Sequence, residues 1–444
     1  MVVALLLVLW AAQAHAVDVT DIPSIQVGQS PNPVGSGARA TGMGGAFIAV
    51  ADDATAASWN PAGLVQLERP EVSAVGSYNY RSEDIRSGSH PELNGENLSD
   101  SSSLNYLSAV LPFRLFDRNM VVSLNYQKLF DFNMDFKGSF FSNFNDGLGD
   151  VFDLKEKDVF RQRGELTTIS PAFAVELTPN LSVGLTFNVW TNMGQKPSWQ
   201  SSDSIDFNMT GTIIGIPFDF TGNLRSDEKD YFYGNSYNVG VLYSPTPTLT
   251  LGAVYKSRFT ANIRREVVET DATYFTMFGI TVPALDIAMG KQYLKLTMPE
   301  SYGIGAAYRA SDRFTIALDV YRTEWSEFIL NTDGLQTRPN VFALESQSKM
   351  KATVQVRMGG EYLIIKPKYV IPVRAGVFYD PEPSENNPNT YYGIAVGTGI
   401  SYDKVSFDVA YTFRTGKTGE SLGVSDTNSN IIQHAALFSV IYRF

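Results

Sequence analysis

Runs in which apolar and polar residues alternate one by one recur along this chain, and they constrain its fold more than any other feature. In the run from 405 to 414, Val405, Phe407 and Val409 share one side while Ser406 and Asp408 share the other. Successive side chains of a β-strand point to opposite faces, so this period of two predicts strands with one apolar face. We expect such strands near residues 70–82, 103–113, 118–132, 165–178, 181–192, 229–244, 247–263, 292–309, 312–326, 350–364, 369–380, 391–402, 404–416 and 432–444.

The length of the runs separates a membrane barrel from a soluble β-sandwich, in which residues alternate as well. The runs cover about 9–14 residues, whereas strands of soluble sheets centre near about 5–6 and a tilted strand that crosses a bilayer needs about 9–11. Tight connections also alternate with long ones, as they do in outer-membrane barrels. We therefore predict an all-β fold, a transmembrane antiparallel barrel of about 14 strands over residues 69–444. The long loops are expected at 83–102, 133–164, 193–228, 264–291, 327–349, 381–390 and 417–431.

Composition excludes several classes of function. The net charge is −11 and the isoelectric point is near 4.9, so we expect no nucleic-acid partner. The chain has no cysteine, which excludes thiolate nucleophiles, Fe–S clusters and Cys-ligated zinc. Its three histidines are His15, His90 and His434. We therefore expect no metal site, no cofactor and no catalytic residues.

The first sixteen residues form an apolar run that ends in Ala14-His15-Ala16. Small residues around such a site are typical of a cleaved secretory signal, and we predict a signal peptide over 1–16. The positive charge usual at the start of a signal is missing from Met1 to Ala4. The alternative is a membrane anchor, although the run is shorter than the about 20 residues of a spanning helix.

The region 17–68 does not alternate, and we expect it to form a compact plug inside the barrel. It contains Gly35-Ser36-Gly37-Ala38-Arg39-Ala40, which matches a dinucleotide-binding fingerprint by its letters. That fingerprint requires a preceding strand and a βαβ unit, and Asn32-Pro33 precedes it here. A helix is expected to begin near Asp52-Asp53 and to stop at Asn60-Pro61-Ala62-Gly63. The alternative for this region is a periplasmic tail.

Residues 37–47 (GARATGMGGAF), 51–54 (ADDA) and 59–64 (WNPAGL) resemble the FadL/TodX family of bacterial outer-membrane transporters of long-chain fatty acids and hydrocarbons. The resemblance implies a fourteen-stranded barrel with an N-terminal hatch, and a hatch motif at Asn60, Pro61 and Ala62. It also implies release of the substrate through a lateral gap at a kinked third strand, here 118–132, whose sequence shows no kink. Related barrels that assist protein secretion carry a similar motif.

The expected partners are hydrophobic small molecules and outer-membrane lipids. The aromatic C-terminal residue Phe444 is expected to be recognised by the barrel assembly machinery. We expect the protein to be a monomer.

Two predicted outer loops are unusually apolar, at 213–220 and 274–289. Exposed apolar patches usually mark a binding surface, and by the resemblance the third and fourth outer loops form the first groove that a substrate meets. The alternative is that these loops pack only on one another and cap the barrel. The substrate-binding residues predicted here are Ile213, Ile216, Phe218, Phe275, Phe278, Ile280 and Leu285.

Arg357 and Arg374 are predicted to line the lumen on adjacent strands. A tight turn near Lys366-Pro367 would place them at similar depth, where their guanidinium groups could hold a carboxylate. Glu361 and Asp319 share the inward faces and could instead neutralise them in internal salt bridges.

The sequence leaves three classes of function open. Passive uptake of hydrophobic compounds such as fatty acids or aromatic hydrocarbons is the main prediction, and the protein then needs no enzyme activity. A structural or secretion-accessory barrel is the alternative. An outer-membrane hydrolase would need His90 or His434 beside a serine.

Overall fold

The computed structural model describes residues 30, 32, 35–145, 149–191, 196–332, 335–337, 350–383, 389–419 and 427–444. The signal peptide predicted over 1–16 and the start of the region 17–68 lie outside these residues. Among the described residues, no helix has the length and apolar character needed to cross a membrane.

Fourteen antiparallel strands close into a barrel, as predicted. The ring is closed because β1 pairs with β2 on one side and with the last strand, β20, on the other. All predicted strand positions are confirmed, although 247–263 and 292–309 are each interrupted at the top of the barrel. The barrel strands are β1 (Glu71–Ser87), β2 (Gly95–Leu115), β3 (Arg118–Asp131), β5 (Val151–Thr178), β6 (Leu181–Trp190), β8 (Ile216–Thr246), β9 (Leu249–Lys256), β12 (Ser301–Ser311), β13 (Phe314–Thr323), β16 (Thr353–Ile365), β17 (Tyr369–Tyr379), β18 (Tyr391–Tyr402), β19 (Val405–Gly419) and β20 (Thr427–Arg443).

The predicted alternation appears as two faces of the barrel wall. On β6, Leu185 and Phe187 are exposed while Thr186 and Asn188 are buried in the lumen. The exposed leucine and phenylalanine would be unfavourable in water and suit contact with lipid, whereas the lumen-facing residues find polar partners. The pairing register of the barrel strands places their apolar faces outward. A slip by one residue would turn the apolar face of a strand into the lumen and its polar face toward lipid.

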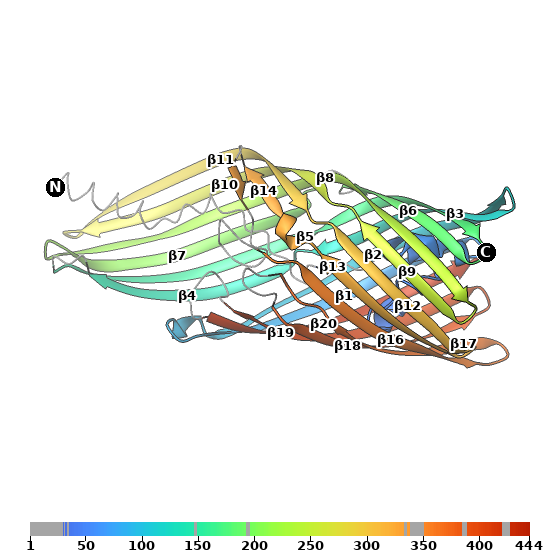
Figure 1. The fold of residues 1–444 in the computed structure, drawn as a ribbon. Coiled ribbons are helices and arrows are strands. Elements are labelled where there is room, and N and C mark those ends of the chain that lie inside the picture. The colour runs from blue at the N-terminus through green and yellow to red at the C-terminus, as the bar shows by residue number, and fades with distance from the viewer. Residues whose placement is uncertain are drawn as a thin grey trace.

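The long loop predicted at 83–102 is wrong, because most of these residues lengthen β1 and β2. The long loops predicted at 133–164, 193–228 and 264–291 are wrong as well, because these segments are largely strands. They extend the wall of the barrel into a second sheet on the side of the long connections, toward the left in Figure 1, and we call it the extension sheet. Its order is β4, β5, β7, β8, β10 and β11, where β5 and β8 continue without a break from the barrel. The added strands are β4 (Met134–Asn145), β7 (Trp199–Ile213), β10 (Phe259–Met277) and β11 (Ile280–Met298), with the short β14 (Ile329–Thr332) and β15 (Leu335–Thr337) beside β11.

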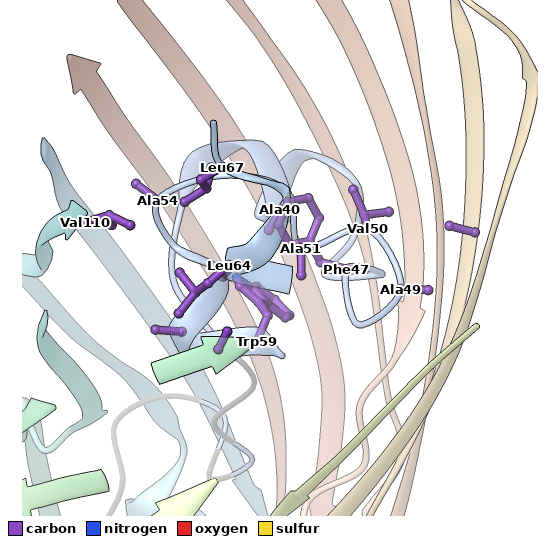
Figure 2. Close-up of a cluster of buried hydrophobic side chains, with 14 of the residues drawn as sticks. Ala40, Phe47, Ala49, Val50, Ala51, Ala54, Trp59, Leu64, Leu67 and Val110 are labelled. Atoms are coloured by element: carbon purple, nitrogen blue, oxygen red, sulfur yellow. The ribbon is translucent and has the colours of Figure 1, made fainter. Parts of the chain in front are cut away.

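The described part of the N-terminal region, residues 35–67, lies inside the ring of strands, and Figure 2 shows its apolar side chains gathered on one another. Its helix was predicted to begin near Asp52-Asp53, and it begins at Ala56 instead. The chain turns at Asn60, whose side-chain oxygen accepts from the Ala62 N–H at 3.1 Å. The helices are α2 (Ala38–Gly42), α3 (Ala56–Trp59) and the 3-10 helix η2 (Pro61–Gln66); two further 3-10 turns, η3 (Pro91–Leu93) and η5 (Trp325–Glu327), lie in connections.

Glycines of the barrel wall let this N-terminal segment approach the strands with its backbone. A Cβ atom on Gly240 would lie 1.9 Å from Asn60 Oδ1, and one on Gly184 would lie 2.3 Å from the Pro61 carbonyl carbon. Across the lumen, a Cβ atom on Gly359 would lie 2.0 Å from the Met43 oxygen. Any larger residue at these positions would push the segment away from the wall.

Strand β3 is paired with β2 and with β5 over residues 120–127. A single irregularity, between Lys128 and Phe130, lies near the upper end of the strand. The wall is therefore continuous over 120–127.

Candidate functional site

The apolar residues predicted to bind substrate lie mostly together at the far end of the extension sheet. Ile213, Ile216, Phe218, Phe275 and Ile280 have the strand parity of one face. The rings of Phe218 and Phe275 stack with centroids 5.9 Å apart. This face therefore offers an aromatic surface.

Two of the predicted residues lie elsewhere. Phe278 is 70% exposed and forms the turn between β10 and β11, with φ of 56°. Leu285 is 68% exposed and has the opposite parity on β11. Because this segment is a strand and not the predicted loop, its side chains point alternately to opposite faces. Leu285 therefore lies on the face opposite Ile280.

A second aromatic cluster lies where the extension sheet joins the barrel, and sequence reasoning missed it. The Trp190 ring stacks on Phe259 at 5.0 Å and meets Phe232 edge-on at 5.7 Å. Trp199 lies 5.0 Å from Phe132. The signal in the sequence was a set of aromatic residues at inward positions near strand ends, where polar residues are expected.

A cavity of about 190 Å³ lies inside the barrel, between the N-terminal segment and the wall. Gly44, Gly45 and Trp59 of the N-terminal segment form part of its lining. The barrel wall contributes residues that include Arg81, Arg357, Phe378, Asp380 and Arg414. The cavity is thus bounded in part by the N-terminal segment and is lined by both charged and aromatic groups.

The structure separates the two arginines that were predicted to lie at similar depth. Glu361 is the residue opposite Arg374, whereas Arg357 is opposite Phe378, four residues along the strand. At about 3.3 Å per residue the two are about 13 Å apart along the wall. The expectation of similar depth is therefore wrong, because the turn length alone did not fix the register.

The surroundings of the two arginines differ as well. Arg374 donates to Glu361 and to Asp408, each at 2.6 Å, which is the arrangement of an internal salt bridge. Arg357 lines the cavity, donates to the Gly44 carbonyl at 3.2 Å and lies 3.6 Å from Asp380. Both cations already have protein acceptors.

Polar contacts tie the N-terminal segment to the wall around its circumference. Asp319 accepts from the N–H groups of Phe47 at 2.6 Å and Ile48 at 2.8 Å. Asn60 donates to the Val241 carbonyl of β8 at 3.1 Å. Arg39 donates to Glu361 at 2.9 Å. These contacts with β13, β8 and β16 hold the segment in place.

The two described histidines lie on different elements, His90 before η3 and His434 on β20, where it borders the cavity. His90 precedes η3 and contacts Glu92 at 3.0 Å. His434 faces the outside of β20 and shares a hydrogen bond of 2.6 Å with the Tyr411 hydroxyl. Within the described ranges, no group of three His, Asp or Glu side chains is arranged to hold a metal ion.

A closed barrel with a lipid-facing apolar exterior, and a segment of the chain packed inside, defines an outer-membrane barrel of the transport class. The family model for outer membrane protein transport proteins (OMPP1/FadL/TodX) matches residues 32–437. The chain belongs to this family and is an outer-membrane protein.

Individual relatives are distant in sequence. The long-chain fatty acid transport protein of Escherichia coli (strain K12) is 22% identical over 413 residues, which cover 85% of this chain and 86% of the relative. A solved FadL homologue of Pseudomonas aeruginosa superposes with a TM-score of 0.59 at 15% identity, over 92% of this chain and 98% of that one. The toluene transporter TodX of P. putida gives 0.59 at 14% identity, over 93% and 99%. At these identities the solved structures support the fold.

Proposed function

We propose that the protein takes up hydrophobic compounds passively across the outer membrane. The observation that carries the proposal is an aromatic surface at both ends of the extension sheet, together with a cavity inside the barrel that the N-terminal segment bounds in part. The names of the relatives, a fatty acid transporter and a toluene transporter, support hydrophobic substrates.

In this proposal the far end of the extension sheet captures the substrate. Burial of apolar surface is worth about 0.8 kcal/mol per CH₂ group, so a long apolar molecule would leave water for the surface around Phe218 and Phe275. The Trp190 cluster receives it next, and the cavity follows. Capture and transfer of this kind need no energy source, and movement follows the concentration gradient.

The region 17–68 serves as the hatch in this scheme, with the motif Asn60, Pro61 and Ala62 as its support. The Ala62 carbonyl accepts from the Ser182 hydroxyl at 3.1 Å, and the Asn60 side chain reaches β8. A small displacement of Asn60 from Gly240 would release these contacts together. The proposal also includes recognition of the exposed Phe444 by the barrel assembly machinery, and a protein that is a monomer.

Substitution of Phe275 tests the capture surface. Phe275→Ala should lower the uptake of an alkane and of toluene at limiting concentration by about threefold to tenfold, because the variant loses an aromatic contact. Tyr274→Ala is the matched control, since Tyr274 is the neighbouring residue on the opposite face and is 51% exposed. Uptake is measured in a bacterial host that lacks its own transporter of this family. Equal loss in both variants, or no uptake by the unmodified protein, would contradict the proposal.

A further inference from the structure

The extension sheet has an inner face that continues the lumen wall. Strand β8 passes from the sheet into the barrel without a break, so Phe218, Glu228 and Asp230 have the same parity as Asn238 in the lumen. Cross-strand pairs assign the inner face of the other strands, because directly opposite residues share a face. A molecule that approaches the mouth along this sheet meets these side chains.

Cations are unevenly divided between the two faces of the extension sheet. Over its described residues the inner face carries one cation, Arg265, which pairs with Asp230 at 2.8 Å and Glu228 at 3.2 Å. The inner-face carboxylates are Glu156, Asp158, Asp203, Glu228, Asp230, Glu269, Asp271 and Asp286. The opposite face carries most of the basic residues, which include Lys155, Lys157, Arg161, Arg163, Arg225, Lys229, Arg264 and Lys291.

The inner-face carboxylates lie between the two aromatic surfaces. Asp158 lies opposite Ile205, and Asp271 lies opposite Asp286, beyond the Phe218–Phe275 stack and before the Trp190 cluster. An anion that passed along this face would be repelled by these like charges. The path therefore attracts an apolar body and repels a negative charge attached to it.

The cavity below adds no unpaired cation to reverse this field. Of the arginines in its lining, Arg81 pairs with Glu83 at 3.1 Å, and Arg414 pairs with Glu382 at 2.9 Å. Arg357 pairs with Asp380 at 3.6 Å.

Arg81 nevertheless keeps two buried nitrogens, Nε and Nη1, without a hydrogen-bond partner among the described residues. A hydroxyl or carbonyl oxygen could accept from these groups without bringing a charge past the carboxylates. A buried donor without an acceptor costs free energy, so such a ligand would be favoured there.

We propose that this channel selects uncharged hydrophobic molecules, such as hydrocarbons and long-chain alcohols, and rejects the anions of fatty acids. The acidic inner face of the extension sheet is the specificity element, and the aromatic clusters supply the affinity. The inference rests on the proposed uptake function and narrows its substrate class.

A matched pair of substrates tests the inference. Uptake of radiolabelled 1-dodecanol and dodecanoate, which share a chain length, is measured at about pH 8 in the host without a transporter of this family. Under these conditions we expect dodecanol uptake to exceed dodecanoate uptake by about tenfold or more after the background of the empty host is subtracted. The triple variant Asp158→Asn, Asp203→Asn, Asp271→Asn should raise dodecanoate uptake at least about threefold and leave dodecanol uptake unchanged.

The control removes the same charge from the opposite face of the sheet. The control is the triple variant Asp153→Asn, Asp206→Asn, Asp219→Asn. These residues lie on β5, β7 and β8 and point to the face opposite the inner one. The uptake rates of dodecanol and of dodecanoate should both be unchanged in this variant. Equal uptake of both substrates by the unmodified protein would overturn the inference while uptake itself stands. An equal gain in the control would also overturn it. No uptake of either substrate would refute the proposed function and the inference with it.

Discussion

Single residues in the lumen are held by charge pairs that have been removed from water. Arg374 is 4% exposed and serves two carboxylates, Glu361 and Asp408, while Glu361 also accepts from Arg39 of the N-terminal segment. A buried pair of this kind contributes little net stability when intact, but loss of one partner leaves an uncompensated charge. The chain is therefore sensitive to the loss of this cation.

Arg374→Met should destabilise the barrel by about 3–5 kcal/mol, because Asp408 loses its cation and Glu361 keeps only Arg39. The midpoint of denaturant unfolding in detergent measures the change. The added substitution Asp408→Asn should restore part of the loss. Arg309→Met, at an exposed position, is the control and should shift stability by less than about 0.5 kcal/mol. A shift for Arg374→Met as small as that of the control would show that the ion pairs of Arg374 do not contribute to stability.

At the scale of elements, the extension sheet is a continuation of the wall that carries opposed carboxylates above the membrane. Burial raises the pKa of the Asp158 carboxyl to about 7, with further contributions from Glu156 and Asp203. The folded pKa lies above the ordinary value of 3.8, so ionisation opposes folding of this part of the sheet. The protonated Asp158 carboxyl therefore stabilises this part of the sheet. This stabilisation is complete below about pH 4 and is lost as the pH rises through about 7.

The strands around Asp158 should therefore be more resistant to opening at pH 5 than at pH 8. Amide hydrogen exchange of residues 151–164, corrected for the intrinsic effect of pH, measures this. Asp158→Asn should remove part of the difference, whereas Asp153→Asn on the opposite face should preserve it. Protection that rises from pH 5 to pH 8 would refute the assignment.

The elements differ in how far the sequence could predict them. The barrel strands were predictable because lipid outside and polar contacts inside impose alternation, as on β6. The extension sheet was missed because water reaches much of both its faces, so β7 has no sharp burial pattern. The depths of Arg357 and Arg374 depend on the register across a turn, which local sequence does not fix. Prediction of the Trp190 cluster would have required knowledge of which strand ends meet.

For the whole molecule, the N-terminal segment fits closely against glycines of the barrel wall. Gly240→Ala would place a Cβ atom 1.9 Å from Asn60 Oδ1 and cost about 1–3 kcal/mol as overpacking. We expect the segment to shift and the conductance of the protein in a planar bilayer to rise severalfold. Gly76→Ala is the control, because nothing lies within 4 Å of its Cβ position. Unchanged conductance in Gly240→Ala would show that the segment does not depend on this contact.

Because β1 and β20 join the two ends of the chain, the pairing that completes the barrel is also the most distant in sequence. The segment before β1 contacts strands from β3 to β20, and those strands surround it together only once that seam has formed. We therefore expect the wall to assemble and its contents to pack in one cooperative event. A chain arrested before the seam forms would have neither a sealed wall nor an ordered interior.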